Sequence, residues 1–208
     1  MKRTNLGTKK ELFYNDIADI WDKKINNFET NKRLRIIFQN LFKKSDLKGK
    51  KFLEVGCGLG YFSEIASKYG AKVTGLDIGD KLVEITSKRV PLGKFVTASA
   101  ANIPFKDVQF DVVLSTEVIE HVDDQDKVLT EIVRVLKKGG LLVITTPNKI
   151  YKPLFDTLSS LRIRPYHGNE KWLAPIEMKA KLEVLGLKIL KFTFFNLGIN
   201  YGFLCIKR

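Results

Sequence analysis

The sequence predicts an α/β protein built on a doubly wound, seven-stranded, mostly parallel sheet that closes with an antiparallel C-terminal hairpin. Three observations carry this prediction. Through residues 51–145, short apolar stretches alternate with amphipathic stretches, an order that favours right-handed crossovers and a parallel sheet covered on both faces. A glycine-rich turn follows the first apolar stretch. Near the end of the chain, two β-rich segments, 188–195 and 201–206, flank a short turn.

The individual elements follow from the spacing of apolar side chains. Residues 9–28 and 31–44 have helical spacing and precede the sheet. The expected strands are 51–55, 72–76, 94–97, 110–114 and 141–145, the helices between them are 61–69, 81–89 and 125–136, and a helical turn covers 117–121. An irregular stretch follows, and helix 174–185 then leads into the hairpin.

Composition indicates one ordinary globular domain of 208 residues, with 44% hydrophobic and 28% charged residues. No apolar run approaches the length of a membrane span, and Cys57 and Cys205 form no disulfide framework. We therefore expect a protein of the cytoplasm, which can also contact a membrane surface. The net charge of +13 divides into +8 for residues 1–51, −2 for 52–148 and +7 for 149–208. The basic flanks favour an anionic lipid, phosphorylated metabolite or nucleic acid as partner, although solvated lysine-rich helix faces explain them about equally well.

A glycine-rich turn and one carboxylate define the candidate ligand site. The turn reads Glu54-x-Gly56-x-Gly58-x-Gly60, and Asp77 ends the next strand, 21 residues after Gly56. Glycine lets the backbone approach a ligand closely, and a carboxylate at the carboxyl end of a parallel strand can accept both hydroxyls of a ribose. A dinucleotide fingerprint would need glycine at position 61, which is tyrosine. The spacing therefore indicates a nucleoside site of another type.

This pattern resembles motif I of the class I S-adenosylmethionine-dependent methyltransferases. Residues 102–105 with 110–113, and residues 135–140, match the family's "lPf…fDvV" and "vLkpGG" segments, and residues 14–21 resemble its N-terminal helix. The resemblance spans roughly residues 10–208. It implies the Rossmann-like methyltransferase fold, S-adenosyl-L-methionine as cofactor, and methyl transfer as activity. It also implies one domain over 1–208, with an N-terminal helical lid (1–48), a cofactor-binding core (49–146), a substrate-side insertion (147–173) and a closing helix and hairpin (174–208).

The resemblance assigns cofactor contacts residue by residue. Motif I would hold the methionine part, Asp77 the ribose, and Arg35 of the N-terminal helix the cofactor carboxylate. Many relatives have an acidic residue for the adenine amine where Ser99 stands here, so we expect adenine recognition to rely on backbone groups of the two following alanines. The expected cofactor-binding residues are Arg35, Glu54, Gly56, Cys57, Gly58, Gly60, Asp77, Ile78, Ser99, Ala100, Ala101 and Thr116.

The candidate catalytic residues lie in the segment Ser115–Val122. On a helix, Glu117, Glu120 and His121 stand at i, i+3 and i+4, so two carboxylates and an imidazole would share one face. The segment around His167 is similar to one in ubiquinone-pathway O-methyltransferases. In those enzymes, and in small-RNA 2′-O-methyltransferases, a Glu-x-x-Glu-His cluster binds a divalent ion beside the acceptor hydroxyl.

The resemblance thus implies a metal site, with Mg²⁺ the expected ion, formed by Glu117, Glu120, His121 and His167. A metal ion would lower the pKa of an acceptor hydroxyl. The alternative is that Glu117, Glu120 and His121 only brace the loop beneath the substrate, and the sequence favours this slightly.

The expected acceptor is a hydroxyl on a small or lipid-linked molecule. Residues 149–164 combine an apolar stripe with basic side chains, which suits either a helix lying on anionic lipid or a lid packed on the domain. Two alternatives stay open, an RNA 2′-O-methyltransferase and a non-catalytic cofactor-binding protein. Nucleic acid is the less expected partner, because the segment 115–118 lacks the Asn/Asp-Pro-Pro-aromatic motif of base methyltransferases. The sequence leaves the oligomeric state open.

Overall fold

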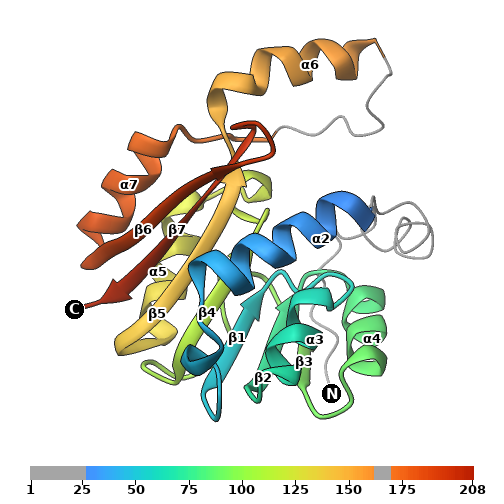
Figure 1. The fold of residues 1–208 in the computed structure, drawn as a ribbon, viewed down its shortest axis with the longest axis vertical. Coiled ribbons are helices and arrows are strands. Elements are labelled where there is room, and N and C mark those ends of the chain that lie inside the picture. Colours follow the sequence, from blue (N-terminus) through green and yellow to red (C-terminus); the bar gives the residue numbers. More distant parts are fainter. Residues whose placement is uncertain (1–26, 162–169) are drawn as a thin grey trace.

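A seven-stranded sheet forms the centre of the computed structural model, which describes residues 27–161 and 170–208 (Figure 1). Its strands are β1 (Lys51–Val55), β2 (Lys72–Asp77), β3 (Lys94–Thr97), β4 (Phe110–Thr116), β5 (Leu136–Pro147), β6 (Leu187–Phe195) and β7 (Asn200–Lys207). They lie in the order β3-β2-β1-β4-β5-β7-β6. Strands β1 to β5 pair in parallel, whereas β7 pairs antiparallel with both β5 and β6. The mostly parallel sheet and its antiparallel hairpin are confirmed.

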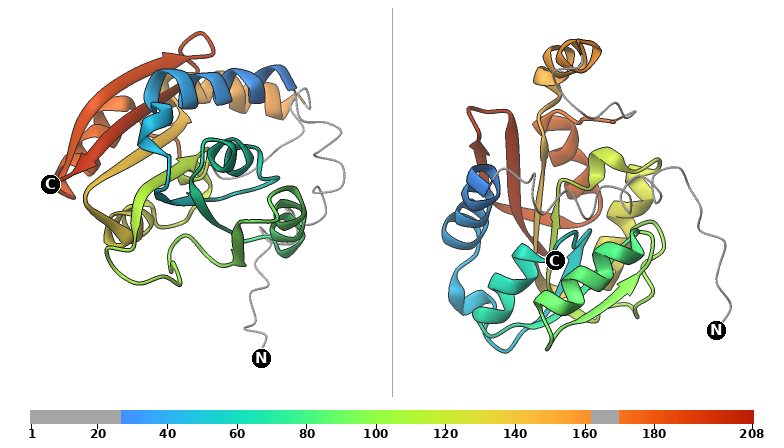
Figure 2. Two further views of the ribbon diagram at one scale, coloured as in Figure 1. Left: turned by 60° about the horizontal axis from the view of Figure 1, so that its bottom comes forward. Right: turned by 90° about the vertical axis from the view of Figure 1, so that its right-hand side faces the viewer.

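Helices cover both faces of this sheet. They are α2 (Asn27–Arg35), α3 (Tyr61–Lys68), α4 (Asp80–Arg89), α5 (Gln125–Val135) and α7 (Pro175–Val184), whereas α6 (Lys152–Ser160) lies beyond the end of β5 (Figure 1). The π-helical turn Ile36–Leu41 continues α2, and 3-10 turns occur at Lys44–Asp46, Ile119–His121 and Lys149–Tyr151. Figure 2 shows α2 and α7 on opposite sides of the sheet. The helix expected at 9–28 lies outside the described residues.

Two apolar clusters, one on each face, hold the layers together. On one face, the π-helical turn and α3 pack against β1 through side chains that include Ile37, Phe38 and Phe52. On the other, α5 and α7 pack against the sheet through side chains that include Ile132 and Leu182. Because a central parallel strand is covered on both faces, four of the five residues of β1 are buried.

The helix ends on the second face are fixed by side-chain caps. Asp124 precedes α5 and accepts a hydrogen bond of 2.9 Å from the amide of Lys127. At α7, Pro175 occupies the first turn, and Glu177 accepts a bond of 2.7 Å from the amide of Ala174. Such caps satisfy amide groups that have no partner within the helix.

Two elements differ from the sequence prediction. The helix expected at 31–44 already includes Asn27, the first described residue, and widens into a π-helical turn from Ile36. The strand expected at 141–145 starts at Leu136, where the helix was expected to end, because Leu136 already pairs with Phe110 before a register shift. Within the described ranges, no helix combines the length and apolar character that crossing a bilayer requires.

Candidate active site

The glycine-rich turn lies at the carboxyl end of β1 and is tied to β2 by its own backbone. The amides of Gly56 and Cys57 both donate to the carbonyl of Leu76, at 2.8 and 2.9 Å. Gly56 has φ +76°, and a Cβ atom there would collide with the side chain of Val118. Glycine is therefore required at this position for both backbone conformation and space.

The next two glycines of the turn face different surroundings. A Cβ at Gly60 would come within 2.7 Å of Thr86 on α4, whereas a Cβ at Gly58 would meet no heavy atom within 4 Å. The hydroxyl of Thr86 donates to the carbonyl of Gly58 at 2.6 Å. Helix α4 thus holds the turn from one side and leaves open space above Gly58, as a backbone that contacts a ligand requires.

Asp77 ends β2 beside this turn and is buried. Its Oδ2 accepts from the amide of Gly58 at 2.8 Å, and its Oδ1 accepts from the amide of Gly79 at 3.0 Å. Burial raises the pKa of Asp77, and these backbone donors oppose the rise. The carboxyl group is fixed in orientation, and each of its oxygens retains a lone pair for a further donor.

Glu54 lies beneath the turn and is almost completely buried. Its Oε2 accepts from the hydroxyl of Ser63 on α3 at 2.5 Å, while Oε1 has no hydrogen-bond partner among the described residues. Burial raises the pKa of this carboxyl group to about 8, and the nearby Asp77 contributes to the rise. Burial also raises the pKa of the adjacent Cys57 thiol, so that this thiol is an unreactive part of the turn.

The expected adenine segment follows β3, next to Asp77. The amide of Ala98 donates to the carbonyl of Asp77 at 2.8 Å. The Ser99 hydroxyl accepts from the amide of Ala101 at 3.2 Å, and Ala100 and Ala101 pack against the core cluster. The structure thus brings these residues to the same edge as the glycine turn.

For the remaining expected cofactor residues, the structure gives burial and position. Ile78 is half-buried directly after Asp77, and Thr116 is buried at the end of β4. Arg35 is exposed in the last turn of α2. Contact between these residues and a cofactor stays a prediction.

The candidate catalytic segment does not form the single helical face that the sequence suggested. Glu117 has φ +54°, and its amide donates to the carbonyl of Thr145 at 3.0 Å, which places it in a turn after β4. Only Ile119–His121 is helical, as a 3-10 turn. That part of the prediction is wrong, because pairing with β5 governs the backbone at position 117.

Neutral side chains bind the oxygens of the two carboxyl groups in this segment. Glu117 accepts from the Thr145 hydroxyl at 3.0 Å and from the Asn200 amide at 2.8 Å. Glu120 is almost fully buried and accepts from the Thr146 hydroxyl at 2.9 Å. Burial, and then the nearby Glu117, raise the pKa of Glu120 well above its usual range.

His121 lies between two buried carboxyl groups. Its Nε2 is 3.8 Å from Oε1 of Glu120, and its Nδ1 is 4.0 Å from Oε1 of Glu170. Sequence reasoning missed Glu170, which lies about 50 residues further along the chain. Its sequence signal was its position within residues 166–177, the segment around His167 that resembles the family. The His121 imidazole could accept a proton from a bound hydroxyl compound.

The expected metal ligands do not assemble in the described part of the chain. Across residues 27–161 and 170–208, no group of three or more His, Cys, Asp and Glu side chains is arranged to hold a metal ion. Both oxygens of Glu117 are already bound by neutral donors. His167, the fourth expected ligand, lies outside the described residues. The described residues alone therefore do not fit a metal ion.

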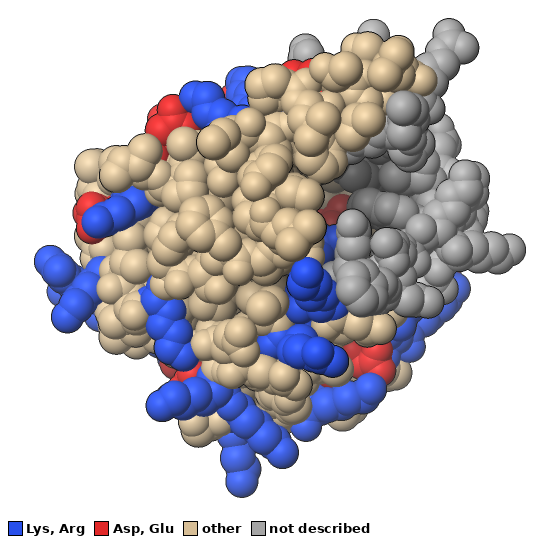
Figure 3. Space-filling model, turned by 45° about the horizontal axis from the view of Figure 1, so that its top comes forward, with Lys and Arg blue, Asp and Glu red and all other residues tan. Residues whose placement is uncertain are grey.

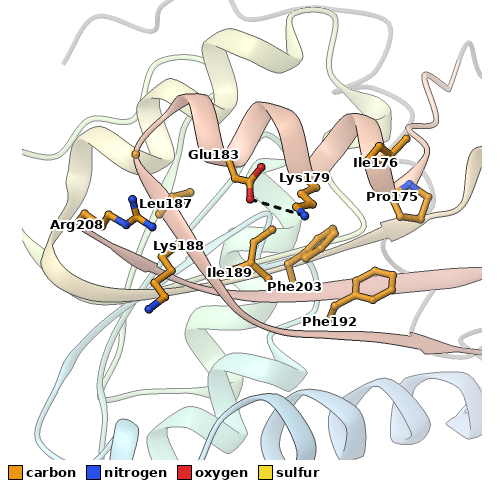
Figure 4. A pocket seen from close by; sticks show the side chains of 11 residues that line it. Pro175, Ile176, Lys179, Glu183, Leu187, Lys188, Ile189, Phe192, Phe203 and Arg208 are labelled. Carbon is orange, nitrogen blue, oxygen red and sulfur yellow. Dashed lines mark ion pairs between the residues drawn. The ribbon is translucent and has the colours of Figure 1, made fainter.

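A hollow of about 710 Å³ opens elsewhere, between α7 and β6 (Figure 4). Its apolar lining includes Ile189, Phe192 and Phe203, and Lys179 and Glu183 form an ion pair of 3.9 Å along α7. The glycine turn and Asp77 do not line this hollow. It is thus separate from the candidate active site.

Comparisons with known proteins identify similar sequences and folds. Residues 53–144 match the family model described as a methyltransferase domain. The chain is 32% identical over 172 residues to a probable S-adenosylmethionine-dependent methyltransferase of Mycolicibacterium smegmatis, covering 82% of this chain but only 62% of that protein. It is 31% identical over 179 residues to a ubiquinone biosynthesis O-methyltransferase of Coxiella burnetii, covering 81% of this chain and 73% of that one.

The fold is similar to that of solved methyltransferases. One is the magnesium protoporphyrin IX methyltransferase of Synechocystis with bound SAH, which has a TM-score of 0.78 and 16% identity, over 96% of this chain and 98% of that one. A second is an S-adenosylmethionine-dependent methyltransferase from Mesorhizobium loti, with a TM-score of 0.69 and 17% identity, over 85% of this chain and 96% of that one.

Proposed function

This chain belongs to the S-adenosylmethionine-dependent methyltransferases, and we propose that it methylates a hydroxyl group on a small or lipid-linked acceptor. The observation that carries the proposal is the position of His121. This imidazole lies beyond the carboxyl end of β4, at the edge of the sheet that also holds the glycine turn. The Coxiella relative, named for O-methylation in ubiquinone biosynthesis, supports a hydroxyl as the acceptor group.

The chemistry requires one proton to be removed. Methyl transfer is an in-line displacement at the sulfonium methyl carbon, so that much of the catalysis consists in positioning the two reactants. A hydroxyl oxygen attacks well only once its proton is lost, and the His121 imidazole is suited to accept it. The Glu170 carboxyl group, whose Oε1 lies 4.0 Å from Nδ1, would stabilise the imidazolium that forms.

No step of this mechanism runs through a metal ion. The described carboxyl oxygens of Glu117 accept from Thr145 and Asn200, and the proton of the acceptor passes to His121. Methyl transfer that continues in excess chelator would support this direct proton transfer to His121. Loss of activity that added Mg²⁺ restores would instead support the metal site suggested by the resemblance, with His167 completing it.

A lipid-linked acceptor is supported by the surface beside this edge. Ile150, Leu154 and Leu161 are 75%, 55% and 64% exposed on and around α6, so that this stripe is not covered by the described part of the domain. Figure 3 shows a broad surface with few charged side chains extending from α6 over the β6–β7 hairpin. We propose that residues 149–164, of which 162–164 lie outside the described residues, contact the membrane that carries the acceptor.

The experiment is a product assay with methyl-labelled S-adenosylmethionine. The ubiquinone-pathway O-methyltransferases that the sequence resembles methylate polyprenyl catechols. A catechol with a polyprenyl chain, the same catechol without it, and a short RNA therefore serve as acceptors, and mass spectrometry locates the added methyl group. We expect an O-methylated polyprenyl catechol. The His121→Asn variant should bind cofactor as the native protein does and form no product. Methylation of an RNA ribose would instead indicate an RNA 2′-O-methyltransferase. Cofactor binding without product from any acceptor class would indicate a non-catalytic cofactor-binding protein.

A further inference from the structure

The turn of the β6–β7 hairpin, residues 196–199, places a leucine in a strained and exposed position. Leu197 has φ +58°, in the left-handed region that leucine rarely adopts, and 92% of its surface is exposed. Asn196 and Gly198 beside it also have positive φ, but asparagine and glycine commonly adopt this conformation. Because the Leu197 side chain packs against almost nothing, stability of the fold does not account for a leucine here. A strained residue of this kind indicates another role.

The carbonyl groups of this hairpin turn have donors from the protein itself. The carbonyls of residues 195 and 196 accept from the amides three positions further along, both at 3.1 Å. The carbonyl of Leu197 accepts from the hydroxyl of Tyr151 at 2.9 Å, and that of Gly198 accepts from the side-chain amide of Asn148 at 3.3 Å. Four successive carbonyls therefore need no water, as backbone entering the apolar part of a bilayer requires.

The same bonds attach the hairpin turn to the base of α6, beside which it lies in Figure 1. Tyr151 ends the 3-10 turn from which α6 begins, and the backbone amide of Asn148 donates to the hairpin turn at 2.7 Å. Ile150 and Leu154 on this segment are exposed. Leu197 thus extends the exposed apolar stripe from one element to a second element that is fixed to it.

The hairpin brings no charge into this surface. Residues 192–206 contain no Asp, Glu, Lys or Arg, although these types make up 28% of the chain. Phe192 and Phe194 of β6 are exposed as well, and Figure 3 shows that few charged side chains interrupt the surface from the hairpin to α6. Such a protruding, uncharged surface suits acyl chains, because charged side chains are costly to bring into lipid.

We propose that the hairpin turn is a second membrane contact, which inserts the Leu197 side chain among the acyl chains of a bilayer. The proposal deepens the proposed function and rests on its membrane contact at 149–164. Asn200 after the turn pairs with Pro147, the last residue of β5, so the turn lies at the carboxyl edge of the parallel strands, as the glycine turn does. Two contacts fixed to each other set an orientation, and this one holds the candidate active site against the membrane.

The test places a fluorescent label on the hairpin turn of the full chain. Cys57 and Cys205 are both buried, so in Leu197→Cys the introduced thiol is the one that a maleimide dye reaches. Leu92→Cys is the control, because Leu92 is equally exposed but precedes β3, at the opposite edge of the sheet. The vesicles contain phosphatidylglycerol and phosphatidylcholine, with or without nitroxide groups on the acyl chains. With vesicles, the label at position 197 should emit at shorter wavelength and be quenched by the nitroxide, and the label at position 92 should show neither change.

Two further variants separate the apolar side chain from the strained backbone. Leu197→Asn removes the leucine side chain and suits a left-handed backbone, so it should raise the midpoint of urea unfolding. It should also lower the vesicle partition coefficient about tenfold or more. Val108→Asn is the matched control, because Val108 is exposed at φ +54° but precedes β4, at the amino end of the parallel strands. It should raise the midpoint likewise and leave vesicle binding unchanged.

A label at position 197 that stays in water while the protein is bound to vesicles would overturn the proposal, and so would a native protein that binds no vesicles. Equal partition of Leu197→Asn and the native protein would also overturn it. Emission that shifts with rising protein concentration, without vesicles, would show instead that a second copy covers the turn. A cooperative urea transition establishes that each variant is folded. Because no measurement needs cofactor or acceptor, failure here is distinguishable from failure of hydroxyl methylation in the product assay.

Discussion

Asp77 and Gly58 are joined across the candidate cofactor site by a hydrogen bond of 2.8 Å from the Gly58 amide to Oδ2 of the carboxyl group. This bond connects the end of β2 to the turn after β1, so the two parts of the sequence pattern act as one unit. The carboxyl group that is expected to bind the ribose also fixes the backbone that is expected to contact the methionine part.

The first prediction concerns this carboxyl group. Asp77→Asn should weaken binding of S-adenosylhomocysteine by about 1.5–3 kcal/mol, the range for hydrogen bonds to a charged group. Isothermal titration measures the change. Asp111→Asn is the matched control, because Asp111 lies at the opposite end of the sheet, bound to the Lys51 amide and to Lys137. Equal losses in the two variants would contradict the assignment.

The second prediction separates backbone conformation from space in the glycine turn. Gly49 and Gly56 have nearly the same φ, +74° and +76°, but a Cβ at Gly49 meets nothing within 4 Å, whereas one at Gly56 collides with Val118. Gly49→Ala should lower the free energy of unfolding by about 1–2 kcal/mol, the cost of a left-handed residue. Gly56→Ala should cost roughly 1–3 kcal/mol more, from overpacking.

Denaturant unfolding measures these stabilities, and titration with S-adenosylhomocysteine measures affinity. Only Gly56→Ala should weaken the binding of S-adenosylhomocysteine. If the two alanine variants lose the same stability, Val118 does not restrict the turn.

The sheet was predictable from sequence because buried strands and their turns have local signals. The apolar residues of β1, the glycines after it and the short turn between β6 and β7 each specify their own conformation, and pairing of the strands then follows from the connections. The start of β5 was not predictable in this way. Leu136 continues the helical spacing of α5, and only its pairing with Phe110 makes it part of a strand.

The candidate cofactor site was predictable to the same degree, whereas the surroundings of His121 were not. The glycine turn, Asp77 and Ser99 lie at or just beyond the carboxyl ends of parallel strands, so the topology alone brings them to one edge. Glu117 leaves the expected helix because of a backbone bond to Thr145, and Glu170 reaches His121 through bonds between distant segments. Neither contact has a periodic signal in the sequence.

The third prediction is a pH dependence caused by Glu54. Burial raises its pKa from 4.5 to about 8, so between these values the folded protein holds a proton that the unfolded chain releases. The stabilisation from this bound proton is complete below the pKa that Glu54 has in the unfolded chain. It is lost as pH rises through the pKa that Glu54 has in the folded protein, by at most about 1.4 kcal/mol per pH unit. Glu54→Gln removes this titration, so its free energy of unfolding should fall less steeply with rising pH.

Urea unfolding without cofactor, at about pH 5.5 and about pH 7.5, measures how steeply the free energy of unfolding falls with pH in the native protein and in Glu54→Gln. If Glu54 had nearly the same pKa in the folded and unfolded states, the two slopes would be equal. Glu84→Gln is the control, because Glu84 is exposed on α4 in an ion pair with Lys88. Its slope should match that of the native protein.

The last prediction concerns the exposed stripe on and around α6. If residues 149–164 contact a membrane, the double variant Ile150→Gln and Leu154→Gln should bind vesicles much more weakly, since burying each such side chain contributes about 1.5–3 kcal/mol. The control is Leu92→Gln, because Leu92 is 92% exposed but precedes β3, at the opposite edge of the sheet.

Co-sedimentation with phosphatidylglycerol and phosphatidylcholine vesicles measures the effect. Two nearby lysines already pair with acidic groups, Lys149 with Glu177 at 2.8 Å and Lys152 with Asp156 at 2.7 Å. The apolar side chains should therefore supply most of the affinity, and added salt should reduce binding to anionic vesicles less than the double substitution does. Native-like sedimentation of the double variant would show that this stripe does not contact the membrane, and would leave a soluble acceptor as the expected substrate.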